Sequence, residues 1–211
     1  MDKRGVFITF EGMDGSGKST QIRRLAKRLV QTGRQVVETV EPGGTRIGAH
    51  IRGILLDVTN QELSPTSELL LYFAARAQNV DQVIQPALAQ GAIVLSDRFT
   101  DSSLAYQGCG RGLGTDTVLS LDKIACRGLK PDLTLLVDID LATSLKRAET
   151  RNRRRERNDR MEEQDSAFYE KVRDAYAALA AAEPERIRIV DGRGNFEAVE
   201  QEIWNVVSRY V

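Results

Sequence analysis

The 211-residue chain has few of the side chains from which several classes of catalytic and structural site are built. It contains two cysteines, Cys109 and Cys126, and a single histidine, His50. The cysteines lack the spacing of a zinc site and are too few for a disulfide framework. One histidine argues against a histidine metal cage and against a Ser-His-Asp hydrolase. We therefore expect a protein of a reducing compartment.

The sequence also lacks a net charge and any long apolar run. Its 30 basic and 30 acidic side chains cancel, so no overall field favours nucleic acid or an anionic membrane as the partner. No stretch approaches the about 18 consecutive apolar residues of a membrane span, and residues 1–4 lead directly into the first apolar run without a signal sequence. We expect a soluble, cytoplasmic protein that binds neither nucleic acid nor a membrane.

Short apolar runs alternate with helical patterns along the whole chain. Uniformly apolar strands that alternate with helices form parallel sheets covered on both faces, which predicts one domain over residues 1–211, an α/β three-layer sandwich with a five-stranded parallel sheet. Ligands of such sheets bind beyond the carboxyl ends of the strands. The expected strands are Val6–Phe10, Val36–Val40, Ala92–Ser96, Leu133–Val137 and Ile187–Val190. The expected helices are Lys18–Gln31, Ile47–Leu56, Pro65–Gln90, Thr115–Arg127, Leu141–Arg154, Glu162–Ala182 and Phe196–Tyr210.

The residues after the first run complete the phosphate-loop pattern G-x-x-x-x-G-K-[ST], between a predicted strand and a predicted helix. Its glycines allow successive backbone N–H groups to point at a polyphosphate. We expect Lys18 to reach the β and γ phosphates of ATP and Ser19 to bind Mg²⁺. The residues expected to bind ATP are Gly12, Met13, Asp14, Gly15, Ser16, Gly17, Lys18, Ser19 and Thr20.

One segment, Lys146 to Arg160, departs from the average composition because it is rich in arginine. A run of this kind is normally a solvated helix face or a nucleic-acid patch. In a chain that binds a triphosphate we prefer a lid over about residues 146–160, because arginines stabilise a transferring phosphoryl group and a closing lid excludes water. Its arginines are Arg147, Arg151, Arg153, Arg154, Arg155, Arg157 and Arg160.

Residues after the second and third strands favour a site for a phosphate acceptor. The segment Glu41-Pro42-Gly43-Gly44-Thr45 follows the second strand, and Arg52 on the next predicted helix either points back toward it or is an ordinary exposed arginine. Asp97 and Arg98 follow the third strand. Together they suit phosphoryl transfer, because a carboxylate can hold Mg²⁺ through water while a neighbouring arginine binds a phosphate.

A helical segment places two aromatic rings close to an arginine. Tyr72 lies four residues and Phe73 three residues before Arg76, so either ring can share a helix face with the guanidinium group. Such a face can stack on a base and donate hydrogen bonds to its carbonyl group; the alternative is plain core packing.

With these motifs in place, the whole chain resembles the bacterial thymidylate kinase family, P-loop nucleoside monophosphate kinases. The resemblance implies ATP-dependent phosphorylation of dTMP to dTDP with Mg²⁺, an arginine-rich lid, and a homodimer packed through helices near the acceptor side. It rests on Phe10-Glu11-Gly12, Glu41 to Thr45, Tyr72 to Gln78, Asp97-Arg98-Phe99, Ala105 to Gly108, Pro131-Asp132 and Asp159 to Glu162.

The resemblance also implies roles for individual residues. Asp14 matches a carboxylate that approaches the 3′-hydroxyl of dTMP, Arg52 and Arg98 match arginines on its phosphate, and Arg76 matches a hydrogen-bond donor to the thymine carbonyl. Tyr72 has the spacing of the stacking ring, although Phe73 stays open because relatives commonly use phenylalanine. Ser103 matches a base reader, and Tyr106 and Gln107 match the segment that rejects a 2′-hydroxyl. The expected substrate-binding set is Asp14, Glu41, Pro42, Arg52, Tyr72, Phe73, Arg76, Arg98, Ser102, Ser103, Tyr106 and Gln107.

The expected catalytic groups are Lys18, Asp14, Arg98 and a lid arginine, and the expected metal ligands are Ser19 and Asp97. Some family members carry the catalytic arginine inside the phosphate loop, but that position here is Gly15. The lid is therefore expected to supply it from Arg151, Arg153 or Arg157, with Arg154 and Arg155 also open.

Three other functions compete with this one. The first is a monophosphate kinase for dUMP or CMP. The second is a nucleotide-dependent switch, although the sequence lacks the N-K-x-D guanine-binding motif of GTPases. The third is a nucleic-acid binder that uses the arginine run.

Overall fold

The computed structural model describes residues 4–155 and 159–211. Within them, the side chains at 148, 149, 151–155, 162 and 163 lie outside the description. The described strands form one five-stranded parallel sheet in the order β2-β3-β1-β4-β5. The strands are β1 (Phe7–Glu11), β2 (Val36–Val40), β3 (Ile93–Asp97), β4 (Leu133–Asp138) and β5 (Ile187–Asp191).

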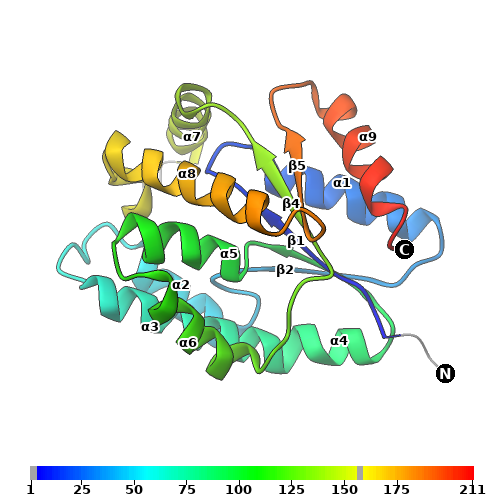
Figure 1. Cartoon of the computed structure of the whole chain (residues 1–211), viewed down its shortest axis with the longest axis horizontal. Coiled ribbons are helices and arrows are strands. Elements are labelled where there is room, and N and C mark those ends of the chain that lie inside the picture. The colour runs from blue at the N-terminus through cyan, green and yellow to red at the C-terminus, as the bar shows by residue number, and fades with distance from the viewer. Residues whose placement is uncertain (1–3, 156–158) are drawn as a thin grey trace.

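Helices cover both faces of the sheet, so the predicted three-layer sandwich is confirmed (Figure 1). One face carries α1 (Lys18–Gln31) and α9 (Phe196–Val207). The other face carries α3 (Pro65–Asn79), α4 (Gln85–Ala89), α6 (Thr115–Cys126) and α8 (Ser166–Ala182). The remaining helices are α2 (Arg46–Leu56), α5 (Thr100–Ser103) and α7 (Leu141–Arg155). No helix among the described residues is long and apolar enough to cross a membrane.

Alternation along the central strands divides the core between the two faces. On β1, Ile8 and Phe10 pack against α1, whereas Phe7 packs among residues of α3 and α6. Thr9 and Glu11 share the face of Phe7 because side chains of a strand alternate, and both are buried. The carboxylate of Glu11 is thereby directed into the layer of α8 rather than toward α1.

The strand boundaries differ from the sequence-based expectation by one residue at most. Four of the five strands continue through the first polar residue after the apolar run, so that they end at Glu11, Asp97, Asp138 and Asp191. Each of these acidic residues pairs in the sheet through its backbone and lies at the edge of the sheet where ligands of parallel sheets bind.

The helices show larger differences from the expectation. The predicted helix over 65–90 contains a π-helical turn, η1 (Val80–Ile84), between α3 and α4. A second π-helical segment, η2 (Leu104–Gly110), continues α5 where no element was predicted. The helix expected from Glu162 begins at Ser166, where Asp165 caps it by accepting from the Phe168 N–H at 2.8 Å. A 3₁₀ turn, η3 (Arg160–Glu163), precedes it.

Candidate active site

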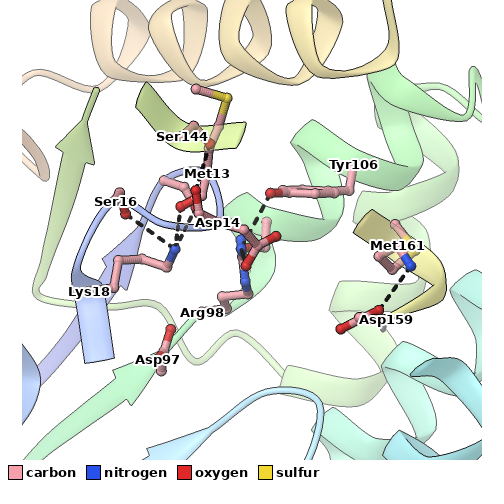
Figure 2. A network of polar contacts seen from close by, with 12 residues as sticks. Met13, Asp14, Ser16, Lys18, Asp97, Arg98, Tyr106, Ser144, Asp159 and Met161 are labelled. Carbon is pink, nitrogen blue, oxygen red and sulfur yellow. Dashed lines mark hydrogen bonds and ion pairs between the residues drawn. The ribbon is translucent and has the colours of Figure 1, made fainter. Parts of the chain in front are cut away.

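The phosphate loop joins β1 to α1, and the Lys18 side chain folds back onto this loop (Figure 2). Gly12 has a φ of 126°, and a Cβ there would lie 2.4 Å from the Val137 carbonyl oxygen, so only glycine fits. The Lys18 Nζ donates to the Gly12 and Met13 carbonyl oxygens, both at 2.8 Å. Burial lowers the pKa of Lys18 to about 8, and the nearby Arg98 charge acts in the same direction.

A hydroxyl and a carboxylate meet where α1 begins and β3 ends. The Ser19 hydroxyl donates to the Asp97 carboxylate at 2.5 Å. Oxygens of this kind suit Mg²⁺, which usually keeps several waters and uses one or two protein carboxylates together with substrate phosphates. The described residues contain no group of three His, Cys, Asp or Glu side chains that would form an all-protein metal cage. The pair therefore fits Mg²⁺ shared with a nucleotide.

Arg98 is hydrogen-bonded by four side chains, of which Figure 2 labels Asp14 and Tyr106. Its Nη2 donates to Asp14 at 3.2 Å and to the Tyr106 hydroxyl at 3.3 Å. Its Nη1 donates to the Ser102 hydroxyl at 2.9 Å and to the Tyr176 hydroxyl at 3.3 Å. Asp14 comes from the phosphate loop, so one carboxylate joins the expected donor and acceptor sides.

Glu11 lies behind Arg98, in a position that the sequence analysis did not assign to the site. Its Oε1 accepts from the Phe99 N–H at 2.7 Å, and its Oε2 accepts from Ser102 at 2.5 Å and from Tyr176 at 2.9 Å. Burial raises the pKa of Glu11 to about 7, and the charge of Asp101 adds to the rise. The only sequence signal was the position of Glu11 at a strand end; Tyr176 gave none.

Arg76 is buried with one unpaired nitrogen. Its Nε donates to Glu41 at 2.6 Å, and its Nη2 donates to the Phe99 carbonyl oxygen and the Ser103 hydroxyl, both at 3.0 Å. Its Nη1 is buried and has no hydrogen-bond partner among the residues that the structure describes. Because buried donors are almost always satisfied in folded proteins, this nitrogen marks a place for an acceptor atom of a ligand.

The two aromatic candidates on α3 have different surroundings. Phe73 is buried in the core cluster with Leu69, and the Arg76 guanidinium carbon lies 4.6 Å from its ring centroid. Tyr72 is only partly buried. Burial raises the pKa of Tyr72, and the charges of Arg98 and Arg52 oppose that rise. Tyr72 therefore lies within electrostatic reach of the arginines of the site, whereas Phe73 supports Arg76 from the core.

Arg52 and Gln107 are both engaged with the protein itself. The Arg52 Nη1 donates to the Pro42 carbonyl oxygen at 2.7 Å, which brings α2 to the segment after β2. The Gln107 amide donates to the buried carboxylate of Glu68 at 3.0 Å. Glu68 also binds Arg111 at 3.1 Å and Arg160 at 2.5 Å.

The arginine-rich segment divides into parts with different surroundings. Arg160 is buried against Glu68 and donates to the Leu55 carbonyl oxygen at 3.0 Å, so it anchors the chain after α7. At the other end, Ser144 donates to the Asp14 carbonyl oxygen at 2.6 Å and Arg147 donates to the Gly192 carbonyl oxygen at 3.2 Å. Arg157 lies outside the described residues, as do the side chains of Arg151, Arg153, Arg154 and Arg155.

Comparisons with known proteins agree on one family. The family model for thymidylate kinase matches residues 10–203. The chain is 51% identical over 201 residues to the thymidylate kinase of Pelobacter propionicus, covering 94% of this chain and 92% of that protein. It is 49% identical over 205 residues to that of Geobacter sulfurreducens, covering 96% of each. A crystal structure of thymidylate kinase from Ehrlichia chaffeensis superposes with a TM-score of 0.78 at 34% identity, covering 97% of this chain and 99% of that chain.

Proposed function

The chain belongs to the thymidylate kinase family, and from that premise we propose which of its residues carry out the ATP-dependent phosphorylation of dTMP to dTDP. The observation that carries the assignment is the position of Asp14 between two cationic groups. Asp14 belongs to the loop that surrounds Lys18, and it also pairs with Arg98 at 3.2 Å. One cation faces the donor phosphates and the other faces the acceptor phosphate. A kinase for dUMP or CMP is not favoured by the relatives.

The donor side is the phosphate loop, residues 12–20. Its backbone N–H groups and the positive end of α1 receive the ATP phosphates. Lys18 exchanges its present bonds to the Gly12 and Met13 carbonyl oxygens for bonds to these phosphates. Ser19 and Asp97 hold Mg²⁺, which supplies charge neutralisation on the phosphate oxygens.

The acceptor side is built around Arg98 and Arg76. Arg98 and Arg52 bind the dTMP phosphate, and Asp14 approaches the 3′-hydroxyl. The unpaired Nη1 of Arg76 donates to the thymine carbonyl, beside Ser103, which already holds Nη2 of the same guanidinium group. We place base stacking on Tyr72 because the Phe73 ring packs in the core.

The remaining members of the acceptor set act at the border of the site. Tyr106 and Gln107 line the sugar, and both come from the π-helical segment η2. Glu41 and Pro42 lie next to Arg76 and Arg52. Ser102 acts through Arg98, to which it is hydrogen-bonded.

The chemistry requires positioning and charge more than proton transfer. The attacking atom is a phosphate oxygen that is already ionised near neutral pH, so no strong general base is needed. Lys18 and a lid arginine, from Arg151, Arg153 or Arg157, stabilise the charge on the transferring group. Residues 146–160 act as the lid of a single kinase domain, and contacts of Arg147 and Arg160 hold its two ends.

We also assign this chain to the cytoplasm and to a homodimer. Cys109 and Cys126 are both free thiols, as expected in a reducing compartment. Exposed apolar side chains gather on neighbouring helices of one face: Ile47 and Ile54 on α2, Leu70 on α3, and Leu119 and Ile124 on α6. Exposed apolar surface on adjacent helices is typical of a subunit interface.

Two experiments test these assignments. Initial rates of ADP formation with dTMP, dUMP, CMP and AMP should show a strong preference for dTMP, and equal rates would refute the acceptor assignment. Light scattering should give a dimer that Leu119→Arg dissociates. Val30→Arg on α1 is the matched control, because Val30 is also exposed, at 57%, but lies on the opposite face of the sheet. A monomeric wild type would contradict the dimer.

A further inference from the structure

We propose that Glu11 is a positioning residue for the acceptor phosphate, because it fixes both the backbone and the guanidinium group of Arg98. The inference rests on the proposed function, in which Arg98 binds the phosphate of dTMP. Glu11 does not contact the nucleotide itself in this account. Glu11 is the last residue of β1, and its side chain lies on the face of the sheet that α8 covers.

The backbone of Arg98 is strained and needs to be held. Arg98 has a φ of 74°, in the left-handed region that non-glycine residues seldom adopt. Such a conformation is unfavourable and persists only where the surroundings enforce it. Here the Arg98 N–H donates to the Phe10 carbonyl oxygen at 3.0 Å, and its carbonyl oxygen accepts from Ser96 at 2.7 Å. The next N–H, that of Phe99, donates to Glu11 Oε1 at 2.7 Å.

The guanidinium group of Arg98 is held by two hydroxyls that Glu11 orients. Ser102 and Tyr176 both accept from Arg98 Nη1 and both lie within hydrogen-bond distance of Glu11 Oε2. Above about pH 7 the Glu11 carboxylate is ionised, and an ionised carboxylate only accepts hydrogen bonds. The two hydroxyl oxygens also lie 2.9 Å apart, but where each hydroxyl contacts Glu11 it donates its hydrogen, and its lone pairs are left to receive Nη1.

The two oxygens of Glu11 accept from different groups: Oε1 from the Phe99 N–H, and Oε2 from the two hydroxyls. A side chain that replaces the carboxylate must therefore offer two acceptor atoms. A glutamine has one acceptor oxygen and one donor nitrogen. Its NH₂ group would either face the Phe99 N–H, which leaves that donor unpaired, or face the two hydroxyls and reverse their hydrogens. In either orientation one of the two supports of Arg98 is lost.

The test is the variant Glu11→Gln, measured by steady-state kinetics above pH 7, where Glu11 is ionised, with each substrate varied in turn. Losing hydrogen bonds to a charged group costs about 1.5–3 kcal/mol, so we expect KM for dTMP to rise about 10- to 100-fold. KM for ATP and kcat should stay within about threefold, because the lost interaction is made equally in the ground and transition states. Unchanged KM for dTMP would overturn the proposal.

A double variant separates positioning from general destabilisation. If Glu11 acts through Arg98, adding Glu11→Gln to Arg98→Ala should change KM for dTMP by less than about twofold, since coupled sites are not additive. A full additional effect would contradict the proposal. If Arg98→Ala alone leaves KM for dTMP unchanged, Arg98 does not bind the dTMP phosphate and the proposed function is wrong at this residue. If Arg98→Ala raises KM and Glu11→Gln does not, only the positioning role of Glu11 is wrong.

Two further variants guard against a protein that does not fold. Tyr176→Phe removes a single hydroxyl from the cluster and should raise KM for dTMP in the same direction by a smaller factor. Tyr210→Phe is the control, because it also removes a single hydroxyl, which donates to the Glu185 carbonyl oxygen at 3.4 Å, but Tyr210 packs with α1 and α9 on the opposite face of the sheet. It should leave KM for dTMP unchanged; a rise equal to that of Glu11→Gln would contradict the proposal.

Discussion

The ion pair between Arg76 and Glu41 gives the sharpest stability prediction. Both side chains are 2% exposed, and their closest atoms lie 2.6 Å apart. Removing one partner of a buried pair leaves an uncompensated charge and costs about 3–5 kcal/mol. Glu41→Ala should therefore destabilise the fold by that amount. A chain of this length loses roughly 2–4 °C for each kcal/mol, so the midpoint of thermal unfolding should fall by about 6–20 °C.

Removing the other partner, in Arg76→Met, should lower the free energy of unfolding by less than Glu41→Ala does. Arginine cannot lose its proton in a protein, whereas Glu41 can neutralise itself. Burial already raises the pKa of Glu41, and the charge of Arg76 opposes the rise. In Arg76→Met that opposition is removed, so Glu41 binds a proton and avoids a buried charge.

Thermal unfolding followed by circular dichroism measures both effects. Glu185→Ala is the control, because Glu185 pairs with Arg188 at 3.2 Å on the surface and exposed pairs contribute about 0–1 kcal/mol. We expect Glu41→Ala to unfold well below Arg76→Met, and the control to match the wild type. A shift in Glu41→Ala no larger than that of the control would refute the reasoning.

Four other predictions follow from the same contacts. Lys18→Met should lower kcat by about 10²- to 10³-fold, as removal of a group that stabilises transition-state charge does, with an unchanged melting curve; near-normal turnover would contradict the assignment. Asp97→Asn should raise the Mg²⁺ concentration needed for half-maximal rate by about tenfold or more, and an unchanged Mg²⁺ titration would count against the metal site. Gly12→Ala should abolish activity, because the new Cβ would lie 2.4 Å from the Val137 carbonyl oxygen; an active variant would show that the loop can shift. The pKa of Glu11 rises on folding from 4.5 to about 7, so its contribution to stability is full below pH 4.5 and is lost as the pH rises through about 7. Compared with Glu11→Gln in urea unfolding, the wild type should lose up to about 3 kcal/mol between those values, and parallel pH curves would contradict this.

The sequence allowed prediction of the parts of the site that depend on neighbouring residues. The phosphate loop is a local pattern, and its strand, turn and helix follow one another along the chain, so Lys18 and Ser19 could be assigned directly. The alternation of apolar runs and helical segments likewise predicted the parallel sheet. Asp97 and Arg98 could be assigned because carboxyl ends of parallel strands meet at one edge.

The parts that were missed depend on contacts between distant residues. Tyr176 reaches Glu11 across 165 positions, and nothing near Tyr176 in sequence distinguishes it from a core tyrosine on an amphipathic helix. Arg160 was predicted as part of an arginine-rich lid, but its buried contact with Glu68, 92 positions away, could not be predicted because arginines surround it in sequence. Tyr106 and Gln107 were predicted as site residues, but the π-helical segment Leu104–Gly110 that carries them was not, because it has no periodic signature.

The most direct test of the account is a crystal structure of the protein with dTMP and an unreactive ATP analogue. We expect the thymine carbonyl at Nη1 of Arg76, the dTMP phosphate at Arg98, and the terminal phosphate of the analogue at Nζ of Lys18. A pyrimidine bound away from Arg76 and Arg98 would contradict the central claim that these two arginines define the acceptor.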